Sequence, residues 1–541
     1  MAGSLMAGSL AAGSLAAGAL LGCSQSEAGR APDDVAVEPK PSAQGAPPTA
    51  PRSDPGQVAP VPNSAQPYSV KRAPPAESVR PESAVPLNVL LITVDTLRAD
   101  HLSCYGYSRA TSPCIDRLAA QGTLFERCIV QWPKTGPSMA SMLSSTYGST
   151  SGVMRETLKV KVPLHYDLLP EIVQRSGWNT LGVVSNISLS EKFQYDQGFD
   201  RYFVHPGASS RGDAVTDRAI ELLEGREPQK NFFLWAHYLD PHAPYVPPKR
   251  HIEPFTSDAK WQAGAAPPLP VDPRVADPNA PAPEMNDLGM IPAYAYFPAR
   301  YPWVKEKDQL RNYVAAYDGD IRYVDEQIGK LLDWMNERQL LTNTVIAFTA
   351  DHGEGLGGHD YYFEHGRFPY DDCAHVPLIV VHPDWQPRRV AAPVALMDLA
   401  PTLLDLLGLK NGWQFEGQSL RTWLAAGAPA EAAAPVFTES GYTKEFDVAV
   451  RRGKWKLIKI GSQKTASLLT GKKYELYDVE ADPGETKNLV DEESEIAEQL
   501  KEELDAFVDS AYAKTPPDPE GVELSAEEKA QMEALGYTGD G

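Results

Sequence analysis

The sequence predicts an α/β fold: a mostly parallel sheet sandwiched by helices, followed by a smaller α+β part. Runs such as Thr344–Thr349 are apolar and β-branched without polar alternation, as in strands buried on both faces. Leu310–Met335 carries apolar residues at helical spacing along one face, which predicts a long amphipathic helix. Such strands and helices alternate along the chain, which is typical of a doubly wound sheet.

The predicted elements follow one another from residue 87 onwards. Proline marks the first turn of two helices, at Pro113 and Pro137, because its fixed φ suits that position. Strands are expected where short apolar runs are bounded by turn residues. The strands are Leu87–Val94, Thr123–Val130, Leu181–Ser185, Phe232–Tyr238, Thr344–Thr349 and Leu378–Val381, and the two proline-marked helices are a segment that ends before Gly122 and Ser138–Ser144.

The N-terminal segment has the composition of an export signal. Residues 1–23 are weakly apolar and end in Leu20-Leu21-Gly22-Cys23, which resembles the bacterial lipobox, whose cysteine carries lipid. No Lys or Arg precedes the apolar run, so the alternative is an export signal with an incidental cysteine. We expect an exported protein of the bacterial cell envelope, either periplasmic or an outer-membrane lipoprotein bound to the membrane through Cys23.

Composition divides the rest of the chain. Residues 24–86 are rich in Pro and Ala with few aromatic residues, which predicts a disordered tether. Residues 87–425 form the predicted catalytic domain, interrupted by a Pro- and Ala-rich insertion at 249–307 that is either a lid or a surface excursion. Residues 426–541 form the C-terminal subdomain, with antiparallel strands near 452–458 and 474–478 and a charged amphipathic helix at 496–507.

Charge and cysteine content narrow the classes of function. The chain has 72 acidic and 50 basic residues, a formal net charge of −22, which argues against nucleic acid as a partner. A small or polymeric anionic substrate remains compatible if a metal ion supplies local positive charge. No CxxC pair occurs, and beyond Cys23 the remaining cysteines allow three pairings among which the sequence does not choose. They are Cys104, Cys114, Cys128 and Cys373.

Two strand ends carry metal-competent side chains. Asp95 ends the first strand, and Asp351-His352 ends the strand that begins at Thr344. Open α/β sheets bind ligands at the carboxyl ends of their strands, so we expect a metal site there. The alternative for Asp351 is a solvated loop with a helix-capping aspartate.

Thr135 precedes a predicted helix, where amide groups and the helix dipole stabilise anions. A hydroxyl that touches a divalent cation there can lose its proton and attack a phosphate or sulfate ester. The alternative is a simple N-cap, which is common for threonine.

The order of the motifs is similar to that of the sulfatase family in the alkaline-phosphatase superfamily. The resemblance extends from about Leu87 to the C-terminus and implies an alkaline-phosphatase-like fold. The motifs that carry it begin at Val94, Thr111, Pro137, Asp240, Tyr317, Ala350, His375, Asp398, Glu475 and Asp482.

The resemblance also implies roles for individual side chains, carried over by position, and one divalent metal ion (Mn, Mg, Zn or Ca). The implied metal ligands are Asp95, Thr135, Asp351 and His352, the implied catalytic residues are Thr135, His242 and His365, and the implied substrate-binding residues are Lys134 and His237.

The sequence departs from the family pattern at two places. Typical sulfatases have Cys-x-Pro-x-Arg at the nucleophile, with the cysteine oxidised to formylglycine, whereas this chain has Thr135 and Met139 at the Cys and Arg positions. Formylglycine is therefore not expected. The family's second aspartate after the first strand is Thr96 here, which removes a carboxylate. A set of two aspartates, a histidine and a hydroxyl favours Mn, Mg or Zn over Ca.

These observations predict a metal-dependent hydrolase that cleaves sulfate, phosphate or phosphonate esters through Thr135. Phosphoglycerol and phosphoethanolamine transferases of the superfamily also use threonine at this point, so a transferase acting on envelope glycans or lipids is the first alternative. A non-catalytic, anion-binding lipoprotein is the second. No obligate protein partner is evident.

Overall fold

The fold is described from a computed structural model of the chain. The structure describes residues 87–154, 160–205, 211–257, 310–409, 415–425, 434–441, 447–461, 472–514 and 522–534. The predicted signal, lipobox and tether and most of the predicted insertion lie outside these residues, and their predictions stand untested. Within them, no helix is both long enough and apolar enough to span a bilayer.

Twelve strands are described, and most coincide with apolar runs. They are β1 Asn88–Val94, β2 Thr123–Ile129, β3 Asn179–Val184, β4 Arg201–Val204, β5 Phe232–Tyr238, β6 Thr344–Ala350, β7 His375–Val381, β8 Arg388–Ala395, β9 Val436–Ser440, β10 Asp447–Arg452, β11 Trp455–Lys459 and β12 Tyr474–Asp478.

The helices separate these strands. The α-helices are α1 Pro113–Ala119, α2 Thr135–Ser144, α3 Gly148–Ser151, α4 Leu169–Arg175, α5 Gly212–Glu224, α6 Lys249–Thr256, α9 Leu310–Glu337, α10 Asp371–Ala374, α11 Leu399–Leu407, α12 Arg421–Leu424, α14 Ser494–Lys514 and α15 Ala526–Ala534. Short 3-10 helices are η1 Ala99–His101, η2 Ser103–Tyr105, η3 Ile187–Leu189, η4 Glu191–Phe193, η6 Leu340–Asn343, η7 Gly358–Asp360 and η8 Leu396–Asp398.

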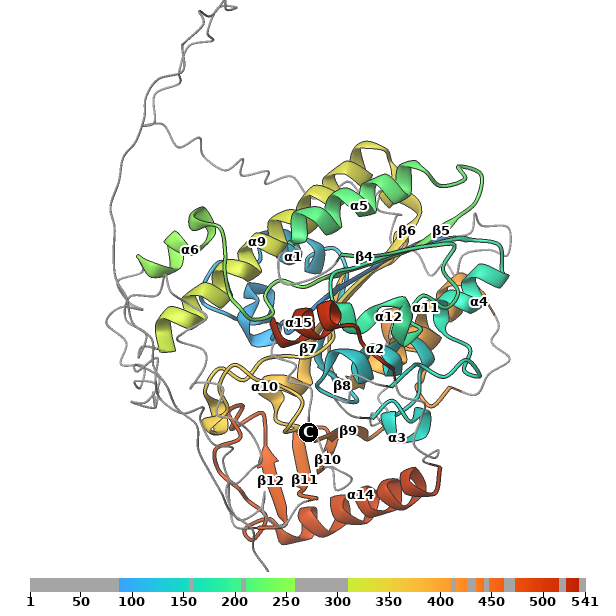
Figure 1. The fold of residues 1–541 in the computed structure, drawn as a ribbon. Helices are drawn as coiled ribbons and strands as arrows, with labels where there is room; N and C mark the ends of the chain where they lie inside the picture. Colours follow the sequence, from blue (N-terminus) through green and yellow to red (C-terminus); the bar gives the residue numbers. More distant parts are fainter. Residues whose placement is uncertain are drawn as a thin grey trace, which may run out of the picture. The chain divides into compact units, whose positions relative to one another are not determined.

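The larger sheet confirms the predicted fold class. Its eight strands lie in the order β4-β3-β5-β1-β6-β7-β2-β8. β7 runs antiparallel to both of its neighbours, and all other neighbouring pairs are parallel. Figure 1 shows α5 and α9 along one face and α2, α4, α11 and α12 along the other. Because both faces are covered, the central strands need apolar residues on both sides, which is why they read as continuous apolar runs.

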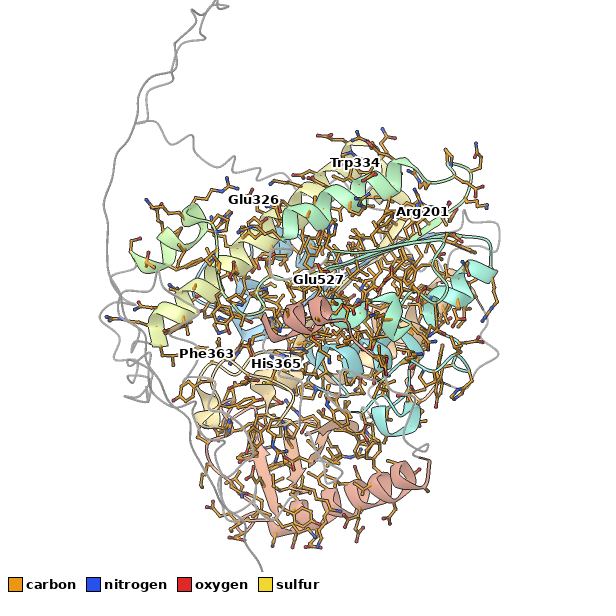
Figure 2. The ribbon with its side chains drawn as sticks, in the orientation of Figure 1. Arg201, Glu326, Trp334, Phe363, His365 and Glu527 are labelled. Carbon is orange, nitrogen blue, oxygen red and sulfur yellow. The ribbon has the colours of Figure 1, made fainter. Side chains whose placement is uncertain are left out.

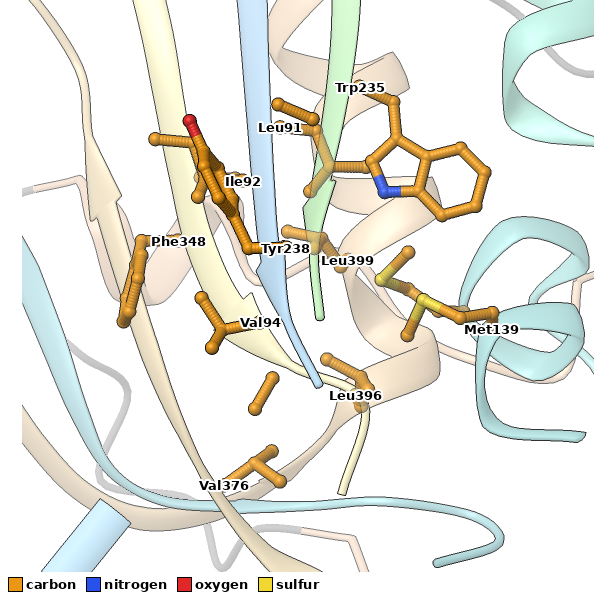
Figure 3. Packing of buried hydrophobic residues seen from close by; sticks show 14 of the residues in the cluster. Leu91, Ile92, Val94, Met139, Trp235, Tyr238, Phe348, Val376, Leu396 and Leu399 are labelled. Atoms are coloured by element: carbon orange, nitrogen blue, oxygen red, sulfur yellow. The ribbon is translucent and has the colours of Figure 1, made fainter. Parts of the chain in front are cut away.

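The core lies on both sides of the central strands. Leu91 and Ile92 of β1 are fully buried, as are Trp235 of β5 and Phe348 of β6. Figure 3 shows Leu91 and Trp235 on the side of the sheet where Met139 of α2 lies, and Ile92 and Phe348 on the other side. Burying side chains of this size contributes roughly 1.5–3 kcal/mol each. The strand ends that follow are therefore held on a rigid support.

The register of the central strands sets the position of the site. β1 lies between β5 and β6, and Val94 of β1 pairs with Tyr238 of β5 and with Ala350 of β6. These three strands are parallel, so the residues that follow them emerge at the same edge of the sheet. Asp95 and Asp351 are the first residues after β1 and β6.

A second, antiparallel sheet forms the C-terminal subdomain, as predicted. Its strand order is β12-β11-β10-β9, and α14 packs on β10 and β11 through Leu500 and Leu504, which are buried among apolar residues of the sheet. The predicted helix at 496–507 is thus the middle of a longer one, because the apolar face continues to Val508 and Ala511.

Some elements differ from the prediction. β4, β8 and β9 were not expected: β4 is only four residues long, and β8 contains arginines and a proline rather than an apolar run. The α2 helix begins at Thr135 and not at Ser138, because Thr135 and Gly136 precede Pro137 in its first turn. Cys104, Cys114, Cys128 and Cys373 are all free thiols in the structure.

A buried ion-pair cluster joins the two sheets. Asp371, at the start of α10, lies 2.8 Å from Arg451 of β10 and 2.7 Å from Lys456 of β11. Lys456 also lies 2.7 Å from Glu485, whose other oxygen accepts a bond from the Asp371 amide. Burial opposes ionisation of Asp371, but Arg451 and Lys456 outweigh it and hold its pKa well below the usual value.

Replacing Asp371 by asparagine is expected to lower the free energy of unfolding at pH 7 by about 3 kcal/mol, because Arg451 loses its buried counter-ion. The folded-state pKa lies below the unfolded value of about 3.9, so the stabilisation is complete above that pH and is lost as the pH falls through the folded-state pKa. Urea unfolding of wild type and Asp371→Asn at neutral and acid pH measures this difference.

The exposed pair Lys249–Glu253 offers a control, since Glu253→Gln should change stability little at either pH. A difference between wild type and Asp371→Asn that is the same at neutral pH and well below pH 4 would contradict the assignment.

Candidate active site

Two aspartates meet at the carboxyl edge of the larger sheet. Asp95 and Asp351 are both 0% exposed. Asn186, in the loop after β3, donates to Asp95 Oδ2 at 2.6 Å. The amides of Thr96 and His352 donate to Asp351 Oδ1 at 3.0 and 2.7 Å. Each carboxylate thus has one oxygen fixed by the protein and the other turned to the shared space.

His237 of β5 joins this pair. Its Nδ1 lies 2.8 Å from the Thr93 hydroxyl on the neighbouring strand, and its Nε2 lies 3.5 Å from Asp95 Oδ2. Trp235 donates to the same hydroxyl at 2.8 Å, which fixes Thr93 in turn. One ligand atom each of Asp95, His237 and Asp351 lies within 4.8 Å of the others. These three groups form a candidate metal cage, in which the Thr93 hydroxyl orients the His237 ring.

Thr135 lies beside this cage, at the N-terminus of α2. Its Oγ1 is 3.2 Å from His352 Nε2, and that nitrogen is 3.5 Å from Asp351 Oδ2 and 3.8 Å from Asp95 Oδ1. Ser138 in the first turn of α2 donates to the Asp351 carbonyl at 2.6 Å, which fastens the helix to the strand end. The hydroxyl therefore faces the metal-competent group from a helix N-terminus.

Three further side chains complete the site. The His365 ring lies 4.2 Å from that of His352 and 5.3 Å from that of His242, between ring centroids. His242 Nδ1 is 2.7 Å from the Ala243 carbonyl oxygen. Lys134 is buried, and its charge acts on both His352 and His365. The site thus combines one lysine, several imidazoles and buried carboxylates.

Burial controls the protonation of these groups. Burial lowers the pKa of His352 to about 3, so its imidazole is neutral at pH 7. Burial and the neighbouring Asp95 raise the pKa of Asp351. For Asp95 burial acts in the same direction, but His242 and the other nearby histidines outweigh it and lower its pKa. One carboxylate is thus kept ionised beside another whose charge is strongly disfavoured.

The donor set fits a divalent cation. Among the described residues, Asp95 Oδ1, Asp351 Oδ2 and His237 Nε2 are buried without a hydrogen-bond partner. Leaving such atoms uncompensated is costly, and a cation that contacts all three would supply the missing interaction. Two carboxylates, imidazole and a hydroxyl suit Mn, Mg or Zn.

The structure brings together every side chain that the sequence marked for this site: Lys134, Thr135, His237, His242, His365, Asp95, Asp351 and His352. Their chemical roles remain predictions. His237 was expected to bind substrate, and its place beside Asp95 and Asp351 makes it a candidate metal ligand as well.

Sequence reasoning missed Asn186 and Glu354. Asn186 lies in a loop after β3, and nothing in the sequence pairs it with Asp95 across 91 positions. Glu354 carried a signal, since it lies two residues after His352 in the same glycine-rich loop. Its side chain is fully buried and contacts His365, and burial raises its pKa.

The resemblance described above predicts that Met139 stands where typical sulfatases have arginine. Its side chain is fully buried in the apolar core. Figure 3 shows it pointing toward Trp235 and Leu399. Met139 therefore brings no charge to the site, whereas Lys134, which precedes α2 and is next to Thr135, is a buried cation beside it.

Comparison with known proteins identifies the family. The model of the Sulfatase family matches residues 87–409, and that of the "N-sulphoglucosamine sulphohydrolase, C-terminal" family matches residues 357–510. An N-acetylglucosamine-6-O-sulfatase of Bacteroides thetaiotaomicron is 24% identical, over 82% of this chain and 90% of that protein. The human iduronate 2-sulfatase is 28% identical, over 59% of this chain and 63% of that protein.

Solved structures show the same fold. The structure of BT4656 in complex with its substrate D-glucosamine-2-N,6-O-disulfate has a TM-score of 0.62 at 22% identity, covering 80% of this chain and 99% of that one. A phosphonate monoester hydrolase of Agrobacterium radiobacter has a TM-score of 0.58 at 20% identity, covering 79% and 96%. With the Sulfatase model matching more than half of its length, this chain belongs to the sulfatase family and is a hydrolase of ester bonds.

Proposed function

We propose that the protein is a metal-dependent hydrolase of sulfate, phosphate or phosphonate esters in which Thr135 is the nucleophile. The observation that carries this proposal is the position of Thr135 Oγ1, 3.2 Å from His352 Nε2 at a helix N-terminus and beside two buried carboxylates. Asp95, Asp351, His352 and Thr135 would hold the cation, with His237 as a further candidate ligand.

A bound cation would stabilise the deprotonated hydroxyl and the charge that develops on the ester oxygens. The protein contributes the rest. The N-terminus of α2 presents Thr135 and favours negative charge there. Asp351 is held by two backbone amides, His352 contacts the Gly353 carbonyl, and Asp95 accepts a bond from the Asn186 side chain. Lys134 and His242 are the predicted contacts of the anionic group.

Thr135 also bears on which ester is favoured. Its oxygen forms a bond to sulfur or phosphorus while the ester oxygen leaves with a proton, and water then attacks the same atom to release Thr135. A formylglycine hydrate can expel sulfate by breaking its own carbon–oxygen bond, which a threonine ester cannot do. Water must therefore attack sulfur or phosphorus directly, and the chemistry favours phosphodiesters and phosphonate monoesters over sulfates.

The relatives leave both ester classes open. Those named above include enzymes that act on sulfated sugars and a phosphonate monoester hydrolase. This chain has Thr135 and Met139 where typical sulfatases have cysteine and arginine, so the substrate class is best decided by experiment.

An activity panel tests the proposal. The purified protein would be assayed with 4-nitrophenyl sulfate, 4-nitrophenyl phosphate, bis(4-nitrophenyl) phosphate and a 4-nitrophenyl phosphonate, each with Mn, Mg, Zn or Ca. We expect turnover that depends on the metal and is highest for the phosphodiester or phosphonate. Absence of turnover for every pair would overturn the proposal, and release that depends on a glycan or lipid acceptor would indicate a transferase.

A further inference from the structure

Glu354 is a buried carboxylate with two side-chain partners. Its side chain is 0% exposed. One oxygen lies 3.1 Å from His365 Nδ1, and the other accepts a bond from the Tyr245 hydroxyl at 3.1 Å. The Glu354 backbone is held separately, by the Asp372 carbonyl and by Arg98. The carboxylate is therefore not needed to fix the loop, and its contacts serve His365 and Tyr245.

His365 is placed by this contact. It lies on the segment between β6 and α10, where Figure 2 labels it beside Phe363. Within the segment the Gly355 amide bonds to the Glu364 carbonyl, and the amide of Gly441, which follows β9, bonds to the Gly366 carbonyl. These backbone bonds set the position of the residue, whereas the orientation of its ring depends on side-chain contacts. A carboxylate on Nδ1 fixes both the ring plane and the nitrogen that faces the site.

The place of His365 suits contact with the leaving group. His352 Nε2 lies 3.2 Å from the nucleophile candidate Thr135, and the His365 ring lies beyond it, 4.2 Å from that of His352. In an in-line displacement the leaving oxygen lies opposite the nucleophile. His365 therefore lies in the same site as Thr135 without contacting it through His352, and its contact with the leaving oxygen is what we infer.

We propose that Glu354 is a positioning residue, which holds the His365 imidazole so that its Nε2 contacts the bridging oxygen of the ester. This inference rests on the proposed hydrolysis at Thr135. The new element is the role of Glu354, which supports the catalytic role already predicted for His365. That support matters most when the departing oxygen carries much negative charge.

Leaving-group dependence tests the proposal. The Glu354→Gln variant keeps the shape of the side chain but weakens the bond to Nδ1. With two esters of the same acid, we expect kcat/KM to fall by about 10²-fold for a simple alkyl ester and by less than about 10-fold for the 4-nitrophenyl ester. Tyr245→Phe is the matched control, because it removes the other bond to the same carboxylate and should affect both esters by the same factor.

Two further measurements separate positioning from a structural effect. In a His365→Ala background, Glu354→Gln should cost no further activity, because a residue that acts through His365 has nothing left to support. The ¹⁵N shifts of the His365 ring nitrogens should change in Glu354→Gln, and this readout does not need turnover.

Equal losses for both esters, full additivity with His365→Ala, or unchanged ring shifts would each overturn the inference. Metal content and melting temperature are measured for every variant to confirm an intact site. If Thr135→Ala remains active, the proposed function fails, whereas the ring shifts still decide whether Glu354 holds His365.

Discussion

Replacing Thr135 by alanine is expected to reduce kcat/KM by about 10³-fold or more, because the alanine side chain has no oxygen that can bond to the sulfur or phosphorus of the ester. The change removes one hydroxyl whose neighbour is His352 Nε2 at 3.2 Å. It leaves Ser138, which fastens α2 to the Asp351 carbonyl, in place. The fold should therefore survive, and steady-state kinetics on the best ester of the activity panel measures the loss.

Two further variants serve as controls for this prediction. Thr135→Ser keeps the hydroxyl and should retain measurable turnover. Thr216→Ala removes a buried hydroxyl that bonds to Tyr238 and to the Gln327 carbonyl outside the site, and it should leave kcat/KM near wild type. Mass spectrometry of the quenched wild-type reaction should find the sulfuryl, phosphoryl or phosphonyl group of the ester on Thr135. Turnover of Thr135→Ala comparable to wild type would remove threonine from the mechanism and leave only the family assignment.

Replacing Asp95 by asparagine is expected to remove stoichiometric metal and, with it, activity. The amide has the same shape but carries no charge, and Asp95 is one of three buried groups whose ligand atoms converge. A cation that binds only the folded state stabilises it by about 2.7 kcal/mol at a free concentration of 100 times Kd. We therefore expect metal to raise the melting temperature of the wild type clearly and that of Asp95→Asn little.

Elemental analysis and thermal melts with and without a chelator measure both effects. Asp325→Asn is the control, since Asp325 is an equally buried carboxylate that caps the start of α1 through the Cys114 and Ile115 amides. It should lower stability but not metal content. If Asp95→Asn kept one metal per chain and a wild-type response to the chelator, the cage at the strand ends would be the wrong assignment.

Much of the fold was predictable because the large sheet is buried on both faces. The prediction gave the exact bounds of the strand Phe232–Tyr238 and those of Thr344–Thr349 to within one residue. A strand that is buried on both faces forms a nearly uninterrupted apolar run, so its ends are easy to recognise in the sequence. β8 and β4 were not predictable in this way. β8 is an edge strand that contains Arg388 and Arg389. Its extended conformation is set by hydrogen bonding to the neighbouring strand β2 and not by an apolar sequence pattern.

Some residues of the site could be predicted from the sequence and others could not, for a similar reason. Asp95 and Asp351 directly follow strands. Because parallel strands end at one edge of the sheet, the sequence alone predicted that these two residues lie close together. Asn186 and Tyr245 could not be predicted, because each reaches the site from a loop whose path depends on tertiary packing. His237 had a usable signal, as a histidine in the otherwise apolar strand next to β1, yet only its register with Thr93 shows which way its ring faces.

The ion-pair cluster at Asp371 has a consequence for dissecting the protein. Asp371 lies in α10, between strands β6 and β7 of the larger sheet, whereas Arg451 and Lys456 lie in strands of the C-terminal sheet. The two family matches overlap across residues 357–409, which include it. If the two halves were expressed separately, each would expose a charge without its counter-ion and an apolar surface that is buried in the whole chain. We therefore expect neither fragment to be soluble with a cooperative melting transition. Co-expression of the two fragments should restore the ion pair.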